Sequence, residues 1–231
     1  MWEQYLDYFR QINIASIFVR FFFSVISGIV IGIDRGMKRR GAGIKTHVLV
    51  CLGATMVMMT GQYVNFYFGQ SHDLTRMGAQ VVSGIGFLGV GTIIVTGRNQ
   101  VKGLTTAAGL WACACIGLAI GVGFYEGAGV MLVLVIMTLI ILEKLDSYVF
   151  YHSKVLELYV ELDSLKHVSE FLKTIRKHDV KITHFEINRT KVKRDYITAM
   201  INIELHQVSE REKTLAFLRE IEGVLYIEDL K

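Results

Sequence analysis

Long apolar stretches dominate the first 142 residues of the chain. Five of them reach or approach the roughly 20 residues that a helix needs to cross a hydrocarbon core about 30 Å thick. These stretches are Ile14–Ile33, Thr46–Phe66, Met77–Thr96, Leu104–Phe124 and Ala128–Leu142. Because lipid cannot satisfy the backbone groups of open strands, the pattern predicts a bundle of about five transmembrane helices.

The periodicity changes beyond residue 152. Alternating apolar residues over Lys154–Asp163 predict a strand, and helical spacing follows over Ser164–His178. The later segments are predicted as strand, strand, helix and strand, over Lys181–Thr190, Tyr196–His206, Ser209–Glu222 and Val224–Leu230. The order βαββαβ is that of a ferredoxin-like α+β domain. We therefore predict a transmembrane domain over 1–142, a connector over 143–152 and a ferredoxin-like domain over 153–231.

Charged residues are distributed unevenly and predict the orientation. Two short loops, Arg35–Lys45 and Arg98–Lys102, are basic, which places them in the cytoplasm, with the N-terminus outside and the tail inside. Residues 143–231 hold 15 of the 25 Lys/Arg and 16 of the 21 Asp/Glu residues, so the tail is nearly neutral. This balance argues against nucleic-acid binding. The four histidines at 167, 178, 184 and 206 lack metal-site spacing and are predicted to be scattered on the surface.

Glycine is concentrated in the apolar part, where 21 of 22 glycines lie between Gly28 and Gly129. Residues 84–89 match the G-x-G-x-x-G fingerprint, but no strand precedes them and no ribose-binding acid follows, so nucleotide binding is rejected. Small residues spaced by four instead predict close helix packing. Gln80 and Ser83 share a helical face with Gly84 and are expected to point into the bundle. The candidate packing residues are Gly28, Gly32, Gly84, Gly86, Gly89, Gly91, Gly109, Gly117 and Gly121.

Asp34 is the only acidic residue between Asp7 and Asp73, at the end of the first apolar stretch. Charges at such positions usually face the bundle or a wet cavity. Asp34 is therefore the candidate ligand for Mg²⁺, or else half of an ion pair with Arg35, Lys45 or Arg98. No firm cofactor is predicted. No phosphate-binding loop or nucleophile–base pair is present either, so we expect no enzyme.

Four separated motifs occur in order along the apolar part of the chain. They are Gly32–Arg35, Ala42–Thr46, Ala79–Gly89 and Val101–Ala108 followed by Leu110-Trp111. Together these motifs resemble the MgtC/SapB family of bacterial inner-membrane proteins. The resemblance implies a multi-pass protein of the bacterial inner membrane, associated with magnesium limitation and, in pathogens, with virulence. It also implies regulation of other membrane proteins, including the F-type ATP synthase. The candidate polar residues are Asp34, Arg35, Lys45, Thr46, Gln80, Ser83, Lys102, Thr105 and Thr106.

The tail resembles an ACT-type regulatory domain in its size and element order. Such domains often dimerise and bind small ligands, so a homodimer or higher homo-oligomer is expected. Three hypotheses follow. The chain is a membrane regulator that binds another membrane protein, a transporter or channel for Mg²⁺ or another cation that uses Asp34, or a small-ligand sensor that acts through its tail.

Overall fold

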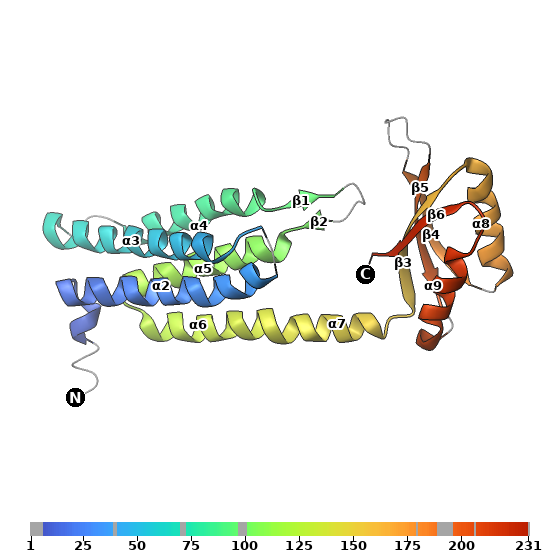
Figure 1. Cartoon of the computed structure of the whole chain (residues 1–231). Helices are drawn as coiled ribbons and strands as arrows, with labels where there is room; N and C mark the ends of the chain where they lie inside the picture. The colour runs from blue at the N-terminus through green and yellow to red at the C-terminus, as the bar shows by residue number, and fades with distance from the viewer. Residues whose placement is uncertain are drawn as a thin grey trace. The chain divides into compact units, whose positions relative to one another are not determined.

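A computed structural model of the chain describes residues 7–38, 41–69, 73–96, 101–178, 180–188, 196–205 and 207–230. The chain divides into two compact units, one ending at Glu143 and the other beginning at Lys144. The first unit is helical and the second is an α+β domain (Figure 1). Each unit has its own core of buried residues.

The helical unit is a bundle built around one central helix. Its helices are α2 (Ile14–Met37), α3 (Ile44–Phe68), α4 (Leu74–Val90), α5 (Leu104–Val122) and α6 (Tyr125–Met137). Helix α5 packs against each of the other four (Figure 1). Helix α2 begins at a reciprocal cap, in which Asn13 accepts from the Ser16 backbone and Ser16 accepts from the Asn13 backbone.

Four helices in the described part of the chain are long and apolar enough to cross a membrane. They are Ile14–Met37, Ile44–Phe68, Leu104–Val122 and Tyr125–Asp146. They correspond to four of the five predicted spans. The fifth predicted span, Met77–Thr96, is corrected because α4 ends at Val90 and has 17 residues, which rise about 26 Å.

The chain leaves α4 through a short antiparallel pair that the sequence analysis did not predict. Strand β1 (Ile94–Val95) pairs with β2 (Val101–Lys102) directly before α5. The residue that follows β2, Gly103, has φ +100° and packs against the Thr92 carbonyl. A Cβ there would lie 2.0 Å from the Thr92 oxygen, so only glycine allows this approach.

The last apolar helix is longer than predicted. Helix α6 continues through a π-helical segment, η1 (Thr138–Leu142), into α7 (Glu143–Tyr151) (Figure 1). The candidate span therefore starts at Tyr125 rather than Ala128 and extends to Asp146. Most of the predicted connector, residues 143–151, is helix α7.

The second unit has the predicted element order. It contains β3 (Val155–Leu162), α8 (Leu165–Lys177), β4 (Lys181–Asn188), β5 (Ile197–Glu204), η2 (Val208–Glu210), α9 (Arg211–Arg219) and β6 (Val224–Asp229). The strands are antiparallel in the order β4-β5-β3-β6, with Leu158 opposite Ile201. This is the ferredoxin-like order, so the predicted fold class is confirmed. Helices α8 and α9 cover one face of the sheet, where Phe171 and Leu218 join its apolar core (Figure 1).

Candidate functional site

A chain of ion pairs lies where α2 ends, at what we call the Asp34 end of the bundle. The Asp34 Oδ2 atom accepts from Arg35 Nε at 2.9 Å and lies 2.6 Å from Arg35 Nη2. The Asp34 Oδ1 atom lies 2.6 Å from Lys38 Nζ, and Lys38 also pairs with Glu143. The Lys38–Glu143 pair joins the C-terminal end of α2 to the start of α7. Neither residue was among the predicted site residues. The i,i+4 spacing of Asp34 and Lys38 was the available signal.

This arrangement does not favour Mg²⁺ binding by Asp34. A hard divalent cation needs about six oxygen ligands, several of them usually carboxylates. Both Asp34 oxygens already contact cationic side chains. Within the described residues, no group of three His, Cys, Asp or Glu side chains is close enough to hold a metal ion. The geometry matches the ion-pair alternative, with Arg35 and Lys38 as partners; Arg98 lies outside the described residues.

The opposite end of the bundle, the Arg20 end, is organised by one fully buried guanidinium. Arg20 Nη1 donates to the Gln62 side chain at 2.7 Å and to the Gly121 carbonyl at 2.8 Å. Its Nη2 donates to the carbonyls of Phe9 and Arg10, and its Nε to the Tyr125 hydroxyl at 3.4 Å. The five hydrogen bonds join α2, α3, α5, α6 and the segment before α2. All five acceptors are neutral, and among the described residues no carboxylate forms an ion pair with Arg20.

A polar seam, defined by Arg20, Ser24, Thr55, Gln62 and Arg35, runs between α2, α3 and α5. Ser24 Oγ lies 2.6 Å from Thr55 Oγ1, and Thr55 donates to the Gly117 carbonyl at 2.9 Å. Gln62 donates to the Val122 carbonyl at 3.0 Å. The three backbone carbonyls that accept hydrogen bonds from the seam belong to α5, at Gly117, Gly121 and Val122. Those of Gly121 and Val122 lie in the last turn of the helix, where carbonyls have no hydrogen-bond partner within the helix. The seam therefore stabilises the end of the central helix.

His47 is fully buried beside the Asp34 end and was not predicted. Its Nδ1 lies 2.9 Å from the Gly43 carbonyl, and its Nε2 has no hydrogen-bond partner within the described structure. The ring packs against α5 at Gly109, where a Cβ would lie 3.6 Å from Nε2. The signal for this position was the spacing of His47, Cys51 and Thr55 along α3, which parallels the small residues of α5.

The inward-facing glycines allow backbone contact. A Cβ on Gly28 or Gly32 of α2 would lie 2.5 Å from the Cα of Val48 or Ile44 of α3. On α5, a Cβ on Gly117 would lie 2.5 Å from the Cys51 carbonyl oxygen. Such distances exclude any larger residue without helix movement. Gly121 lies similarly close to Thr55, Gly89 is near Ala107, and Gly91 faces its own helix backbone.

Helix α4 corrects the expected positions of Gln80 and Ser83. Both side chains are exposed rather than inside the bundle, and so is Gly84. The inward face of α4 carries Gly78, which meets the Met58 Sδ atom, and Ile85, which is buried. Close packing by the inward glycines, and not the polar stripe, sets the rotation of this helix. Gly86 is also exposed, with open space above it.

The remaining candidate polar residues belong to the loop ends. Thr106 is buried in the first turn of α5. The side chains of Lys45, Thr46, Lys102 and Thr105 are exposed. The structure thus brings together only Asp34 and Arg35 from the predicted polar set, and adds Lys38 and Glu143 to them.

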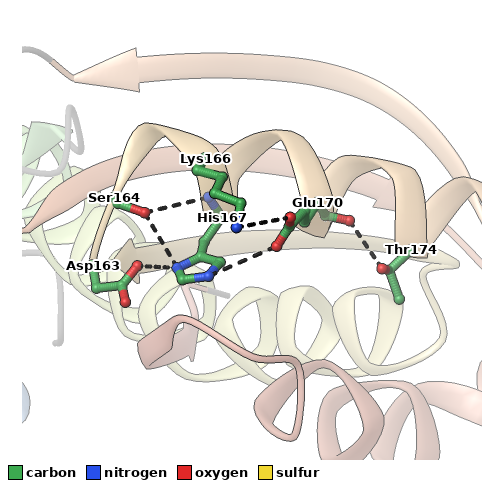
Figure 2. Close-up of polar contacts among 6 residues, drawn as sticks. All are labelled: Asp163, Ser164, Lys166, His167, Glu170 and Thr174. Carbon is green, nitrogen blue, oxygen red and sulfur yellow. Dashed lines mark hydrogen bonds and ion pairs between the residues drawn. The ribbon is translucent and has the colours of Figure 1, made fainter.

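The tail carries a separate polar cluster at the start of α8 (Figure 2). His167 Nδ1 contacts the Asp163 carboxylate and lies 3.2 Å from Ser164 Oγ, while Nε2 lies 3.7 Å from a Glu170 oxygen. The hydrogen bond that His167 donates to the Asp163 carboxylate, with further help from the charges of Glu170 and Glu222, raises the pKa of His167 above 6.5. The same bond lowers the pKa of Asp163.

The His167 ring is also packed against the turn before β6. Gly223 has φ +84°, and a Cβ there would lie 2.3 Å from the ring. The side chain of His167 is 18% exposed, so it is not one of a scattered set of surface histidines as we expected. The rings of His178 and Phe217 are in contact, with centroids 4.1 Å apart and planes tilted by 52°. His206 lies outside the described residues. The signal for the cluster was the i,i+4 spacing of Asp163 and His167.

The fold and its apolar helices define a multi-pass membrane protein with a ferredoxin-like domain after the bundle. The model of the MgtC family matches residues 21–148 of the chain. The chain is 33% identical over 219 residues to YhiD of Escherichia coli strain K12, covering 91% of this chain and 96% of that protein. It is 26% identical over 209 residues to SapB of Bacillus subtilis, covering 87% and 90% of the two chains.

A shorter match with higher identity involves MgtC of Brucella abortus strain 2308. The two chains are 43% identical over 109 residues, which is 47% of this chain and 44% of that protein. The chain therefore belongs to the MgtC family, and the resemblance inferred from its motifs is confirmed.

Proposed function

We propose that this MgtC-family chain is a non-enzymatic membrane regulator, which acts by binding another membrane protein and does not itself move Mg²⁺. The observation that carries the proposal is the electropositive polar seam inside the bundle. Its two charged members, Arg20 and Arg35, are both buried. Within the described residues, no carboxylate lies deep in the seam, and Asp34 at its end is engaged by Arg35 and Lys38.

The charge of this seam opposes a cation. A divalent ion 4 Å from a guanidinium is repelled by about 8 kcal/mol at an effective dielectric constant of 20. Cation pathways offset such barriers with rings of carboxylates or carbonyls. Here the carbonyl groups of Gly117, Gly121 and Val122 already accept hydrogen bonds from seam residues. The glycine contacts between α2, α3 and α5 leave no room for a hydrated ion beside them.

The tail supports a regulatory role because it has a core of its own. Phe171, Ile175 and Ile201 are fully buried within it, independently of the bundle. A domain of this kind can control assembly from outside the membrane. We propose the cytoplasm as its location, in agreement with the basic loops, and the inner membrane as the location of the bundle.

The first test is ion flux in reconstituted liposomes that contain a Mg²⁺-sensitive dye. The proposal predicts that liposomes with the wild-type chain show no more Mg²⁺ influx than empty liposomes. A Mg²⁺ ionophore added as a positive control should produce the dye signal in both. The alternative is a cation transporter, for which the support is the name of the relative YhiD, which refers to magnesium transport. A saturable flux that Asp34→Asn abolishes would establish that alternative and refute ours.

The second test concerns the partner. The family resemblance suggests the F-type ATP synthase, so we would measure ATP-driven proton pumping in inverted membrane vesicles with and without the chain. Pumping should fall when the full chain is present, and a chain lacking residues 153–231 should have a smaller effect. Unchanged pumping, together with no cross-link to any synthase subunit, would exclude this partner.

A further inference from the structure

The surface of the bundle is hollowed between α2 and α3, in what we call the Met59 pocket. Its volume is about 390 Å³. Most of its lining residues recur every three or four positions along α3 and therefore share one face of that helix. The lining consists of Met56, Met59, Thr60 and Tyr63 of α3, Ile17 and Phe21 of α2, and Ile12 from the segment before α2.

The described residues that line the pocket present almost no polar atoms to its interior. The Thr60 hydroxyl donates to the Met56 carbonyl at 2.8 Å, so its hydrogen bond is made within its own helix. Met59 is buried and forms the floor, whereas Met56 and Tyr63 are half-exposed at the rim. A polar ligand would lose its hydrogen bonds to water here without replacement, so the pocket suits a hydrocarbon.

The position of the pocket along α3 places it inside the membrane. Both α2 and α3 are long and apolar enough to cross a bilayer. Met56 is the middle residue of α3 (Ile44–Phe68), and a hydrocarbon core about 30 Å thick covers about ten residues on either side of it. Tyr63 then lies about 10 Å from the midplane and Tyr67 about 16 Å, at the interface where tyrosine is enriched. The pocket therefore extends from the middle of the core toward the membrane surface at the Arg20 end.

This direction and depth match those of a lipid chain in one leaflet. A phospholipid has its headgroup at the interface and its acyl chains directed toward the midplane, and Ile12 lies at the interfacial end of the pocket. Apolar cavities stay free of water, and an empty cavity deprives its lining atoms of dispersion contacts. An engineered apolar cavity of about 150 Å³ takes up benzene, so the Met59 pocket has room for a segment of an acyl chain.

The packing of α2 on α3 explains why the hollow lies at this end of the bundle (Figure 1). Toward the Asp34 end, Gly28 and Gly32 bring the two backbones into contact. Toward the other end, the side chains of Arg20 and Gln62 lie between the same two helices and are hydrogen-bonded at 2.7 Å. The contacts that stabilise the bundle therefore also form the pocket.

We propose that the Met59 pocket binds one acyl chain of a bilayer phospholipid, which enters from the leaflet at the Arg20 end. The surrounding lipid is equally apolar, so the chain is held by shape and dispersion contacts. Methionine suits this role because its flexible side chain adapts to irregular apolar neighbours. Arg10, two residues before Ile12, already pairs with Asp7 and Glu126, so we expect no preference for an anionic headgroup.

The test places the full chain in phosphatidylcholine liposomes that contain a trace of the same lipid with a photo-activated group near the end of one acyl chain. After illumination, mass spectrometry should find adducts on Met59, which is buried, as well as on Phe22, which is exposed and does not line the pocket. Ile17→Trp fills the pocket and should lower the ratio of Met59 to Phe22 adducts at least fivefold. Phe18→Trp enlarges an exposed neighbour outside the pocket and should leave the ratio unchanged.

A second measurement counts the lipid that stays with the protein. Native mass spectrometry of the wild-type chain, extracted from bacterial membranes in mild detergent, should show one phospholipid per chain, and Ile17→Trp should retain at least fivefold less. Wild type without Met59 adducts, or an equal fall in both tryptophan variants, would overturn the proposal. A retained isoprenoid quinone in place of a phospholipid would refute the occupant.

The wild-type results do not depend on how the variants fold. The inference also stands apart from the proposed function, since a Mg²⁺ flux would refute the regulator without emptying the Met59 pocket.

Discussion

The interiors of the bundle and of the tail are packed with different kinds of residues. The tail buries apolar side chains between a sheet and two helices, with Leu156, Phe171 and Ile201 fully inaccessible. The bundle buries Arg20 and Thr55 together with glycines that bring backbones into contact. The apolar residues of the bundle are instead often on its outside, as with Phe18, which is 72% exposed.

The difference follows from the surroundings of each unit. In water, removing apolar surface from solvent drives association, so the tail places Leu and Ile inside. Lipid is as apolar as leucine, so helices gain little from burying such residues against each other. Hydrogen bonds and close backbone packing then decide how the bundle assembles. Four predictions test this comparison, from the largest expected effect to the smallest.

Truncation of the tail core should have the largest effect. Phe171→Ala removes a fully buried ring and should destabilise the tail by about 3–5 kcal/mol. Hydrogen exchange measured by mass spectrometry on the full chain should show faster exchange in β3, β5 and α8. Exchange in α3 and α5 should not change. Loss of protection in both units would show that they do not fold independently.

The bundle should be weakened by removal of the buried Arg20 guanidinium. Arg20→Met loses five hydrogen bonds, which at about 0.6 kcal/mol each in a membrane protein amounts to about 3 kcal/mol. Thermal unfolding of the detergent-solubilised chain measures the loss, with Lys102→Gln at an exposed site as the control. If Arg20→Met were as stable as wild type, apolar packing would suffice and the contrast with the tail would disappear.

Glycine packing should have a somewhat smaller effect. Gly117→Ala places a Cβ 2.5 Å from the Cys51 carbonyl and should cost about 1–3 kcal/mol by forcing α3 and α5 apart. Gly53→Ala adds the same methyl group where nothing is near, and should be neutral or slightly stabilising because alanine favours helix. Equal stabilities of the two variants in the same unfolding assay would contradict the close-packing explanation.

The smallest effect should be the pH dependence of the tail. The pKa of His167 is higher in the folded tail than in the unfolded chain. Its contribution to the free energy of unfolding is therefore fully present below pH 6.5 and is lost as the pH rises through the folded-state pKa. The lowered pKa of Asp163 means that its own contribution is lost only in acid. Urea unfolding, followed by a spectroscopic probe in the tail, measures this effect. At pH 6 the free energy of unfolding of wild type should exceed that of His167→Gln, and the difference should become smaller toward pH 9.

Asp163→Asn removes the main partner of His167. In that background, His167→Gln should therefore lower the free energy of unfolding at pH 6 by less than it does in wild type. A gap that widened with rising pH would mean that the imidazole is stabilised in its neutral form, contrary to the arrangement in Figure 2. Both variants lie in the tail, so exchange protection in the bundle should not change.

Sequence patterns predicted much of this fold but little of the site geometry. Apolar length located four spans, and alternation located the tail strands, because each signal depends on a single element and its solvent. The spacing of Arg20, Ser24 and Arg35 places them on one face of a helix, which is a local property of the sequence. The partners of Arg20 cannot be found in this way, because Gln62 and the Gly121 carbonyl lie on other helices and no local rule links them.

The sequence by itself determined the two units, their secondary structure and the membership of the MgtC family, because hydrophobic period, length and ordered motifs are local properties. Only the tertiary structure decided which glycines are inside, where α4 ends and which way it turns. Gly78 and Gly89 match surfaces of α3 and α5, whereas Gly84 does not, and this steric fit turned Gln80 and Ser83 outward. The rotation of a helix depends on its neighbours, and its own sequence does not contain them.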